Sequence, residues 1–463
     1  MAKLTFRRPG RHVTTPASRI KYKHCATHSR EVKILLTTKP QFLPFGADLA
    51  NVKHKVDSPY QVVCVLRGSG FPYGAADAPR IINVGKALLS ADVRFRVMHC
   101  GPSVIAANSE ASGTYDGIPF EYTSLTTKRP RVFLLRALLY AWGFTVLTIR
   151  LLQLLPQRHS TCIYVYIQSG PIGVATAAIC QVLGLPIVQE VNEWWPKTEG
   201  CSQFTKWLFR RPMFSLATGA LVISTLIEER VRATAARLNH PLIVHRMPII
   251  ADLAKFKAAN QPPLLASIDL GLPYFAWCGG VAGYIEDVFF MIRATGQVKQ
   301  RGLLSQLVIV GPVDPATREQ ILKYAETYGV GGMVVLAGFV DDDQLQALYN
   351  CAAALLLPLW DDDRSKTRFP TKLSGYLASG TPVITCSVGD LTQFLENGKS
   401  AYIGSPGDEQ DFARNMFVVL RDRTLARVIG SAGRRVCEAE IDYTKHSRQL
   451  ADFFISCIRC NRE

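Results

Sequence analysis

The sequence predicts an α/β protein built from two doubly wound domains that face each other across a cleft. From residue 61 onward, short apolar runs alternate with helical patterns, which is typical of parallel sheets covered by helices on both faces. The chain has 463 residues, 48% hydrophobic and 19% charged, so it is too long for one ordinary core and apolar enough for two. The periodicity is lost between residues 255 and 272, where Pro262 and Pro263 give a turn signal, and this break separates the two halves.

Both halves begin with a strand and continue as alternating strands and helices. In the first half, the predicted strands cover residues 61–66, 93–98, 162–167, 186–191, 220–224 and 243–247, with helical patterns at 79–90, 131–155, 171–184 and 225–238. In the second half, the predicted strands cover residues 274–278, 306–310, 333–336, 353–357, 382–385 and 401–403. A last helix from about residue 443 to 457 carries Leu450, Phe453 and Phe454 on one apolar face.

These patterns divide the chain into five parts. They are a basic extension (1–58), a first domain (59–255), a linker (256–272), a second domain (273–440) and a closing helix (441–463). Ligands of doubly wound sheets bind beyond the carboxyl ends of the strands. The expected site therefore lies in the cleft between the two domains.

The formal net charge of +16 is concentrated at the N-terminus. Residues 1–30 contain eight Arg and Lys residues and no Asp or Glu, and this stretch of low hydrophobicity predicts disorder. The rest of the chain is only moderately basic and shows no basic stripe interleaved with aromatic residues, so we expect no nucleic-acid partner.

The cysteines indicate a reducing compartment. The twelve cysteines are scattered singly through apolar runs, without the spacing of a disulfide framework. Cys457 and Cys460 form one Cys-x-x-Cys pair with no second pair, so no metal site is predicted. No apolar core follows the basic N-terminus, so we expect no secretory signal and a cytoplasmic protein.

The longest apolar segment, residues 132–155, leaves three interpretations open. Its length would permit a membrane span, but Arg136, Gly143 and Arg150 recur at seven-residue intervals and share one helix face. Three basic residues stand just before it, as expected where a chain meets anionic headgroups: Lys128, Arg129 and Arg131. The segment is a core helix, a span, or an interfacial helix that holds the protein on the inner face of the cytoplasmic membrane.

Residues 364–386 carry the chemistry of a phosphate site. Pro370 fits the first turn of a helix, which places Arg368 just outside that helix and Lys372 in its first turn. Free backbone N–H groups, the positive end of the helix dipole and cationic side chains would then converge on one point. The alternative is a helix that carries exposed positive charge.

Two glycine-rich loops occupy corresponding places in the two halves. Residues 67–74 follow the first strand, and residues 278–283 follow the first strand of the second half. Glycines let the backbone approach a ligand closely, although the spacing is not that of a dinucleotide fingerprint. The repetition supports a role for both loops.

Together these motifs resemble the large family of retaining glycosyltransferases with two Rossmann-like domains, the GT-B type, numbered family four and called glycosyl transferases group 1. The most specific motifs are Arg368-Phe-Pro-Thr-Lys372, Tyr376-Leu-Ala-Ser-Gly380-Thr-Pro382 and Val388-Gly389-Asp390. Supporting matches are Gly279-Gly280, Gly338-Phe339-Val340, Phe71-Pro-Tyr-Gly74 and Glu190-Val-Asn-Glu193. The resemblance covers residues 60–460.

The resemblance implies transfer of a sugar, with retention of configuration, to a glycan or lipid-linked acceptor in polysaccharide or cell-envelope glycan synthesis. It implies a nucleotide-sugar donor held by the second domain, an acceptor held by the first, a last helix that crosses back to the first domain, and no metal or other cofactor. Preorganised cations can stabilise the leaving diphosphate without a magnesium ion.

The resemblance also assigns roles to single residues. Arg368 and Lys372 would grip the diphosphate, with Arg364 as a helper, and Glu193 would serve the acceptor unless it is a structural group. The remaining donor contacts would come from Gly279, Gly280, Val340 and Asp390, and the acceptor contacts from Gly70, Tyr73, Gly74 and Asn192. Asp390 has an alternative role as the cap of a helix that begins at Leu391.

Four sites in the sequence depart from the family pattern. Thr367 and Gly375 stand where two glutamates are usual, so these positions lack the carboxylates that the resemblance implies for contacts to the donor sugar and ribose. Residues 284–287 stand where an Arg or Lys is usual, and Asn192 replaces a histidine. These departures favour one alternative function, a non-catalytic relative that binds a nucleotide sugar or a partner protein. Another enzyme on the same fold, such as an epimerase or a phosphorylase, is a third possibility.

Overall fold

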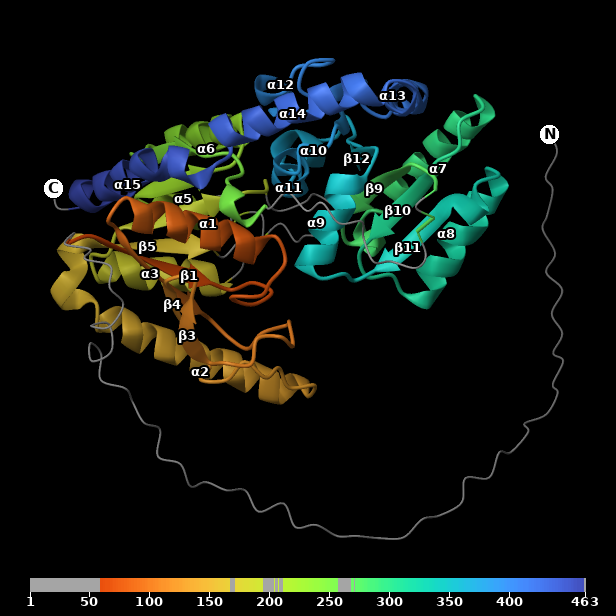
Figure 1. Cartoon of the computed structure of the whole chain (residues 1–463). Coiled ribbons are helices and arrows are strands. Elements are labelled where there is room, and N and C mark those ends of the chain that lie inside the picture. Colours follow the sequence, from red (N-terminus) through yellow and green to blue (C-terminus); the bar gives the residue numbers. More distant parts are fainter. Residues whose placement is uncertain are drawn as a thin grey trace, which may run out of the picture. The chain divides into compact units, whose positions relative to one another are not determined.

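The computed structural model describes residues 59–166, 171–194, 204, 207, 211–256, 268–269 and 271–461. The predicted basic extension (1–58) and most of the predicted linker (256–272) lie outside the described residues. The described chain forms two sheets with helices packed around them (Figure 1).

The first sheet has eight strands in the order β3-β4-β2-β1-β5-β6-β7-β8. All neighbours are parallel except β3 and β4. The strands are β1 (Gln61–Leu66), β2 (Arg94–His99), β3 (Ser112–Tyr115), β4 (Ile118–Tyr122), β5 (Thr161–Tyr166), β6 (Ile187–Val191), β7 (Gly219–Val222) and β8 (Ile243–Arg246). The helices of this half are α1 (Asp77–Ser90), α2 (Phe133–Leu152), α3 (Pro171–Val182), α5 (Pro212–Leu216) and α6 (Thr225–Leu238), with 3-10 turns η2 (Leu155–Ser160) and η3 (Leu253–Lys255).

The second sheet has six parallel strands in the order β11-β10-β9-β12-β13-β14. The strands are β9 (Tyr274–Cys278), β10 (Gln306–Val310), β11 (Val334–Gly338), β12 (Ala354–Leu357), β13 (Val383–Cys386) and β14 (Tyr402–Gly404). The helices are α7 (Ile285–Gln300), α8 (Pro315–Thr327), α9 (Asp342–Cys351), α10 (Asp363–Thr367), α11 (Lys372–Ala378), α12 (Leu391–Phe394), α13 (Glu409–Arg421) and α14 (Arg423–Glu440), with 3-10 turns η4 (Val281–Gly283) and η5 (Gly331–Met333).

The strand orders place a switch point in each sheet. The chain leaves β1 toward β2 on one side and later returns to β5 on the other, and β9 lies in the same way between β10 and β12. Every residue of β1 and β5 is buried, as expected for strands covered on both faces. Loops at such switch points are where doubly wound sheets bind ligands.

The hairpin of β3 and β4 was not predicted from the sequence. β3 is an edge strand of alternating exposed and half-buried residues, so it lacks the apolar run that marks the buried strands. Its turn, Asp116-Gly117, has a positive φ at both residues, 48° and 78°. Asp-Gly favours this two-residue turn in hairpins, so the dipeptide was the sequence feature that could have predicted the hairpin.

The last helix, α15 (Tyr443–Cys460), returns to the first half, as the resemblance implied. It packs against α1 and β5 (Figure 1), and its apolar face, including Phe453 and Phe454, belongs to the core around β1. Where the chain crosses back to the first half, the Tyr443 N–H donates a hydrogen bond to the Ala251 carbonyl over 3.0 Å.

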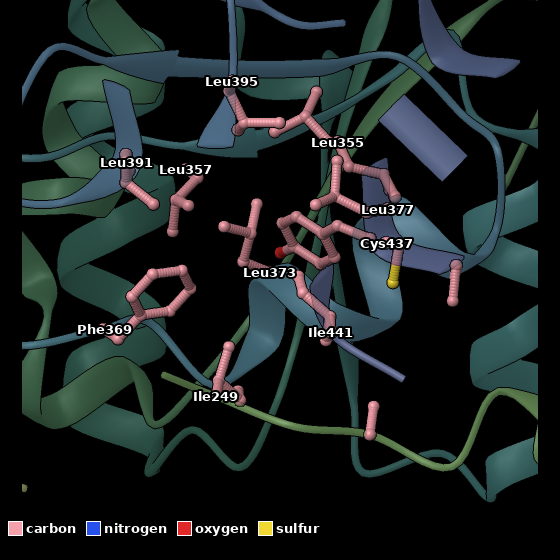
Figure 2. Packing of buried hydrophobic residues seen from close by; sticks show 14 of the residues in the cluster. Ile249, Leu355, Leu357, Phe369, Leu373, Leu377, Leu391, Leu395, Cys437 and Ile441 are labelled. Atoms are coloured by element: carbon pink, nitrogen blue, oxygen red, sulfur yellow. The ribbon is translucent and has the colours of Figure 1, made fainter. Parts of the chain in front are cut away.

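The core beneath α11 joins residues from both halves. Leu373 and Leu377 of α11 pack with Leu355 and Phe369, and Ile249 of the first half lies in the same cluster (Figure 2). Because α11 packs in this shared core, the core fixes the position of the backbone that carries Lys372 at the start of the helix.

The predicted apolar helix is present as α2. Among the described residues it is the one helix long and apolar enough to cross a membrane by length and composition. Three residues on one stripe, Gly143, Leu147 and Leu151, are buried, and the two leucines pack in the core with β5 and α3.

Candidate functional site

A cleft of about 600 Å³ is lined by residues of both halves. Its walls include the residues that directly follow β1, β6 and β12. The first half contributes Arg67, Gly68, Ala75, Ala76, Asp77, Pro79, Arg80, Asn83, Tyr166, Asn192, Glu193, Ile223, Ile249 and Ile250, and the second half contributes Tyr284, Asp287, Leu357, Pro358, Leu359, Trp360, Asp362, Arg364, Ser365, Arg368, Phe369, Pro370, Thr371, Lys372 and Ser374.

The helix that was expected to bind phosphate begins later and is shorter than the pattern suggested. α11 starts at Lys372 and has seven residues, and Pro370 precedes it in a turn closed by the Leu373 N–H and the Pro370 carbonyl over 3.0 Å. A helix of two turns contributes little dipole. The positive character of the cleft therefore comes mainly from side chains.

Three cationic side chains in the cleft gather around one aromatic ring, that of Tyr284. Arg364 lies over the ring with its Cζ 4.5 Å from the centroid, and the Lys372 Nζ lies 5.4 Å from it. Arg368 donates from Nη1 to the Tyr284 hydroxyl over 3.0 Å. We call Arg364, Arg368 and Lys372 the cation cluster. Within the described residues, the buried Nε of Arg364 has no hydrogen-bond partner, so the cluster has a donor to offer.

One member of the cation cluster, Lys372, lies over the ring of Trp277. Its Nζ lies 4.0 Å from the ring centroid of Trp277, and burial lowers its pKa from 10.5 to about 8. Asp287 opposes this shift, because a nearby carboxylate favours the charged ammonium. An anion beside Nζ would do the same.

Asp287 places one carboxylate beside the cation cluster. Its Oδ1 accepts from the Trp360 Nε1 over 2.8 Å, and burial raises its pKa against the opposing effects of this hydrogen bond and of Lys372 and Arg364. Tyr284 and Asp287 thus lie in the segment 284–287, where the family usually has an Arg or Lys. The departure of this segment from the family pattern was the sequence feature that pointed to these two residues.

Arg368 and Glu193 meet across the cleft. The Arg368 Nη2 lies 2.5 Å from the Glu193 Oε1, and their side chains are 19% and 27% exposed. The structure therefore brings together the residues predicted to act on the donor and on the acceptor. A diphosphate bound by Arg368 would compete with Glu193 for this guanidinium.

A buried network that was not predicted supports the first half of the cleft. Glu190 accepts from the Arg80 Nε over 3.2 Å and from the Tyr164 hydroxyl over 2.6 Å. Burial raises the pKa of Glu190, while Arg80 and Tyr164 act in the opposite direction. Arg80 also donates to the carbonyls of Met247 and Pro248. The motif around Glu193 thus contains a structural carboxylate, Glu190, next to one that faces the cleft.

The predicted acceptor residues are only partly brought together. Asn192 lines the cleft and donates from Nδ2 to the Tyr166 hydroxyl. Gly70, Tyr73 and Gly74 do not line the cleft. A Cβ at Gly70 would come within 2.3 Å of the Asn108 Nδ2, so packing inside the loop explains this glycine.

Neighbouring residues of the same loop do face the cleft. Gly68 lines it, and a Cβ there would come within 1.9 Å of the Asp77 Oδ2. Asp77 accepts from the Ser69 N–H over 2.8 Å and from the Ser69 hydroxyl over 2.7 Å. Asp77 therefore fixes the loop, and Gly68 is required for this contact.

The predicted donor residues outside the cation cluster lie at different distances from it. A Cβ at Gly279 would lie 3.1 Å from the Lys372 Nζ, and open space surrounds the position of a Cβ at Gly280. Val340 does not line the cleft and packs against the shared core. Gly279 is thus beside the cluster, whereas Val340 is not.

The side chain of Asp390 contacts the first half of the chain. It does not line the cleft, and its side chain does not cap α12. Its Oδ2 instead accepts from the Thr225 N–H over 2.7 Å and from the Thr225 hydroxyl over 3.0 Å. A carboxylate of the second half therefore caps α6 of the first half.

Both positions that lack a carboxylate lie in packed surroundings. Thr367 is 3% exposed and its carbonyl accepts from the Ser224 hydroxyl over 2.8 Å, which joins the two halves. A Cβ at Gly375 would lie 3.3 Å from the Phe256 Cε1 and 3.4 Å from the Tyr349 Cε2. The space beside Gly375 is thus taken by aromatic rings.

Comparison with known families matches the second half of the chain. Residues 273–422 match the family model described as Glycosyl transferases group 1. The chain is similar to the D-inositol 3-phosphate glycosyltransferases of Streptomyces avermitilis, with 25% identity over 245 residues, and of Streptomyces bingchenggensis, with 24% identity over 220 residues. These alignments cover 51% and 45% of this chain and 51% and 46% of the relatives, so the chain spans about half the length of the curated relatives it matches.

Solved structures match nearly the whole chain. Sucrose-phosphate synthase from Thermosynechococcus elongatus aligns with a TM-score of 0.66 and 16% identity, covering 87% of this chain and 100% of that structure. Anabaena HepE in complex with UDP-glucose aligns with a TM-score of 0.64 and 14% identity, covering 86% and 99%. The fold is that of GT-B glycosyltransferases, with two Rossmann-like domains.

Proposed function

We propose that this chain is a glycosyltransferase that moves a sugar from a nucleotide-sugar donor to a glycan or lipid-linked acceptor, with retention of configuration and without a metal ion. The family match of residues 273–422 and the GT-B fold support sugar transfer. The observation that carries the proposal is the cation cluster of Arg364, Arg368 and Lys372, which lines a cleft between the two domains.

The cation cluster has the chemistry that a leaving nucleoside diphosphate requires. As the bond between sugar and phosphate breaks, negative charge grows on the phosphate oxygens. Arginine binds such oxygens through several N–H donors, and Lys372 adds a charge in a site of low polarity. Arg364 already presents a buried Nε without a partner in the described structure. The cluster would take the place of a magnesium ion.

Retention follows if the acceptor attacks from the face that the diphosphate leaves. A phosphate oxygen of the donor would then take the acceptor proton, and no protein nucleophile is needed. Glu193 would orient the acceptor hydroxyl, because its carboxylate lies at the cleft beside Arg368. Asn192, on the same wall, would add a polar contact to the acceptor.

The proposed setting is the cytoplasm, in polysaccharide or cell-envelope glycan synthesis. The ten cysteines that the structure describes are all free, which suits a reducing compartment. UDP-glucose is the first donor to test, because the similar fold of Anabaena HepE was solved with UDP-glucose.

A non-catalytic relative that binds a nucleotide sugar is the second candidate. The specific observation that favours it is Gly375, where aromatic side chains of Phe256 and Tyr349 occupy the surroundings of a position expected to carry a carboxylate. Such a protein would keep the cation cluster and bind the donor without releasing nucleoside diphosphate.

The two candidates are separated by donor-dependent release of nucleoside diphosphate. We expect release from UDP-glucose, or from another common donor in a screen with lysate acceptors, to fall at least 100-fold in Lys372→Ala, because an uncompensated phosphate charge costs several kcal/mol in such a site. Lys366→Ala is the matched control, since Lys366 lies on α10, pairs with Asp361 and does not line the cleft.

Three results distinguish the outcomes. Release that depends on Lys372 supports the transferase. Donor binding by calorimetry without release from any donor supports the non-catalytic relative. Release that is unchanged in Lys372→Ala would show that the cation cluster is not the diphosphate site.

A further inference from the structure

Helix α2 turns a largely apolar face outward. Leu134, Leu138 and Trp142 are 67%, 59% and 49% exposed, and they follow one another at four-residue intervals. Ile149 and Leu152 extend the same face and are 47% and 45% exposed. Large side chains on one helix face that remain in contact with water indicate a surface that is covered by something else.

The opposite face of α2 is fixed to the domain. Gly143 and Leu147 are buried, and the Arg150 Nη2 lies 3.1 Å from the Glu121 Oε2. A helix that is packed along one side and ion-paired at Arg150 cannot enter a bilayer across its full thickness without breaking these contacts. The geometry allows α2 to lie along a surface instead.

The stretch of sequence that contains α2 carries charged side chains of a single sign. No Asp or Glu occurs between Glu121 and Glu190, and this stretch contains Lys128, Arg129, Arg131, Arg136, Arg150 and Arg158. Lys128, Arg129 and Arg131 are exposed immediately before the helix, and they form no ion pair within the described part of the chain. Unpaired cations beside an apolar helix face complement a surface that is apolar inside and anionic outside.

We propose that α2 docks this protein on an anionic lipid surface, with its axis along the membrane plane. Leu134, Leu138 and Trp142 enter the boundary between headgroups and acyl chains, and Lys128, Arg129 and Arg131 contact lipid phosphates. This proposal is independent of the sugar-transfer reaction. A protein partner would be expected to supply carboxylates for the three cations, whereas a lipid surface supplies phosphates and an apolar layer together.

Binding to vesicles tests the proposal on the full chain. We expect the protein to co-sediment with vesicles of phosphatidylcholine and phosphatidylglycerol, and to bind pure phosphatidylcholine at least tenfold more weakly, because each cation near an anionic surface contributes roughly fivefold. Salt should weaken the binding to the anionic vesicles.

Two sets of variants separate the apolar and the charged contributions. Leu134→Gln with Leu138→Gln and Trp142→Gln should reduce vesicle binding at least tenfold, and so should Lys128→Gln with Arg129→Gln and Arg131→Gln. The matched controls are Leu425→Gln with Val428→Gln, which remove exposed apolar side chains from α14, and Arg318→Gln with Lys323→Gln and Lys445→Gln, which remove three charges elsewhere. Both controls should bind as the wild type does.

Four results would overturn the proposal. They are no binding of the wild type to anionic vesicles, unchanged binding of either α2 variant, and a wild-type dimer that the apolar α2 variant dissociates, which would show that a second copy covers the face. The fourth is loss of binding on neutralising the basic residues of 1–30 in the full chain while both α2 variants still bind, which would assign the contact to the N-terminal extension. Since the substituted side chains are exposed, circular dichroism should show an unchanged fold for every variant.

Discussion

Burial and charge act against each other at Lys372. The surrounding protein lowers the pKa of its ammonium from 10.5 to about 8, and the face of Trp277 lies 4.0 Å from Nζ. In the free protein the charged form therefore prevails below about pH 8 and the neutral form above it. A bound diphosphate favours the charged form and raises this pKa again.

The affinity for a nucleotide sugar should consequently fall as the pH rises through about 8. Below this pH, Lys372 already carries the charge that binds phosphate; above it, binding must take up a proton from the solvent. Calorimetry with UDP-glucose between pH 6.5 and 9.5, in buffers of different ionisation enthalpy, measures both the dissociation constant and the proton uptake. The diphosphate of UDP-glucose does not titrate in this range.

Lys372→Arg provides the control for this pH dependence. An arginine keeps its charge throughout the range, so the decline near pH 8 should disappear. A wild-type dissociation constant that is the same at pH 7 and pH 9.5 would contradict the assignment of Lys372 to the donor site.

Tyr284 organises the cation cluster through its ring and its hydroxyl. Tyr284→Phe keeps the ring and loses the hydrogen bond from Arg368, so donor affinity should fall on the order of 2- to 10-fold. Tyr284→Ala also removes the surface that Arg364 and Lys372 face, and the loss should reach about 10- to 100-fold.

The measurement is the dissociation constant of UDP-glucose for each variant. Tyr328→Ala is a suitable control, because Tyr328 is 40% exposed and does not line the cleft. If Tyr284→Ala bound UDP-glucose as tightly as the wild type, Tyr284 would not be needed to position the cation cluster.

At the scale of the elements, the start of α6 depends on a residue from the other half of the chain. Ser224 caps the helix through its own side chain, and Asp390 adds a second acceptor for the Thr225 N–H. Asp390→Ala should lower the free energy of unfolding by about 1–3 kcal/mol, because it leaves a partly buried N–H unpaired. Asp390→Asn keeps one oxygen and should cost less.

This substitution also tests the donor contact expected from the sequence. Thermal unfolding reports the lost cap, and calorimetry with UDP-glucose reports the donor. Lower stability with unchanged donor affinity identifies Asp390 as a capping residue. A lower affinity for UDP-glucose with an unchanged free energy of unfolding would instead support a contact between Asp390 and the donor sugar.

At the scale of the whole molecule, the last helix completes the core of the first half. Phe454 of α15 is fully buried, and its ring centroid lies 5.7 Å from that of Tyr164 on β5. Phe454→Ala should destabilise the first half by about 3–5 kcal/mol through lost burial and a cavity. Asp452→Ala, exposed on the same helix, is the control.

Scanning calorimetry is the appropriate measurement, because a chain with two domains need not unfold in one step. The transition of the first half should move to lower temperature in Phe454→Ala. An unchanged thermogram would mean that α15 detaches before the domain unfolds.

The sequence predicted the buried strands well because parallel sheets covered on both faces require continuous apolar runs. It missed β3 and β4, since an edge hairpin with one open side carries no such run. It also identified Arg368, Lys372 and Glu193 as site candidates, and these residues line one cleft. Contacts between the two halves were not predictable, because the partnership of Asp390 with Thr225 depends on how the domains pack and leaves no local pattern.

The ion pair between Arg368 and Glu193 has a kinetic consequence. As long as Arg368 pairs with Glu193, the Oε1 of this carboxylate is engaged and competes poorly for a sugar hydroxyl. When a nucleotide sugar binds Arg368, it breaks the ion pair with Glu193. Binding of the donor thus frees Glu193 to contact the acceptor. We therefore expect compulsory-order kinetics, with the donor bound before the acceptor.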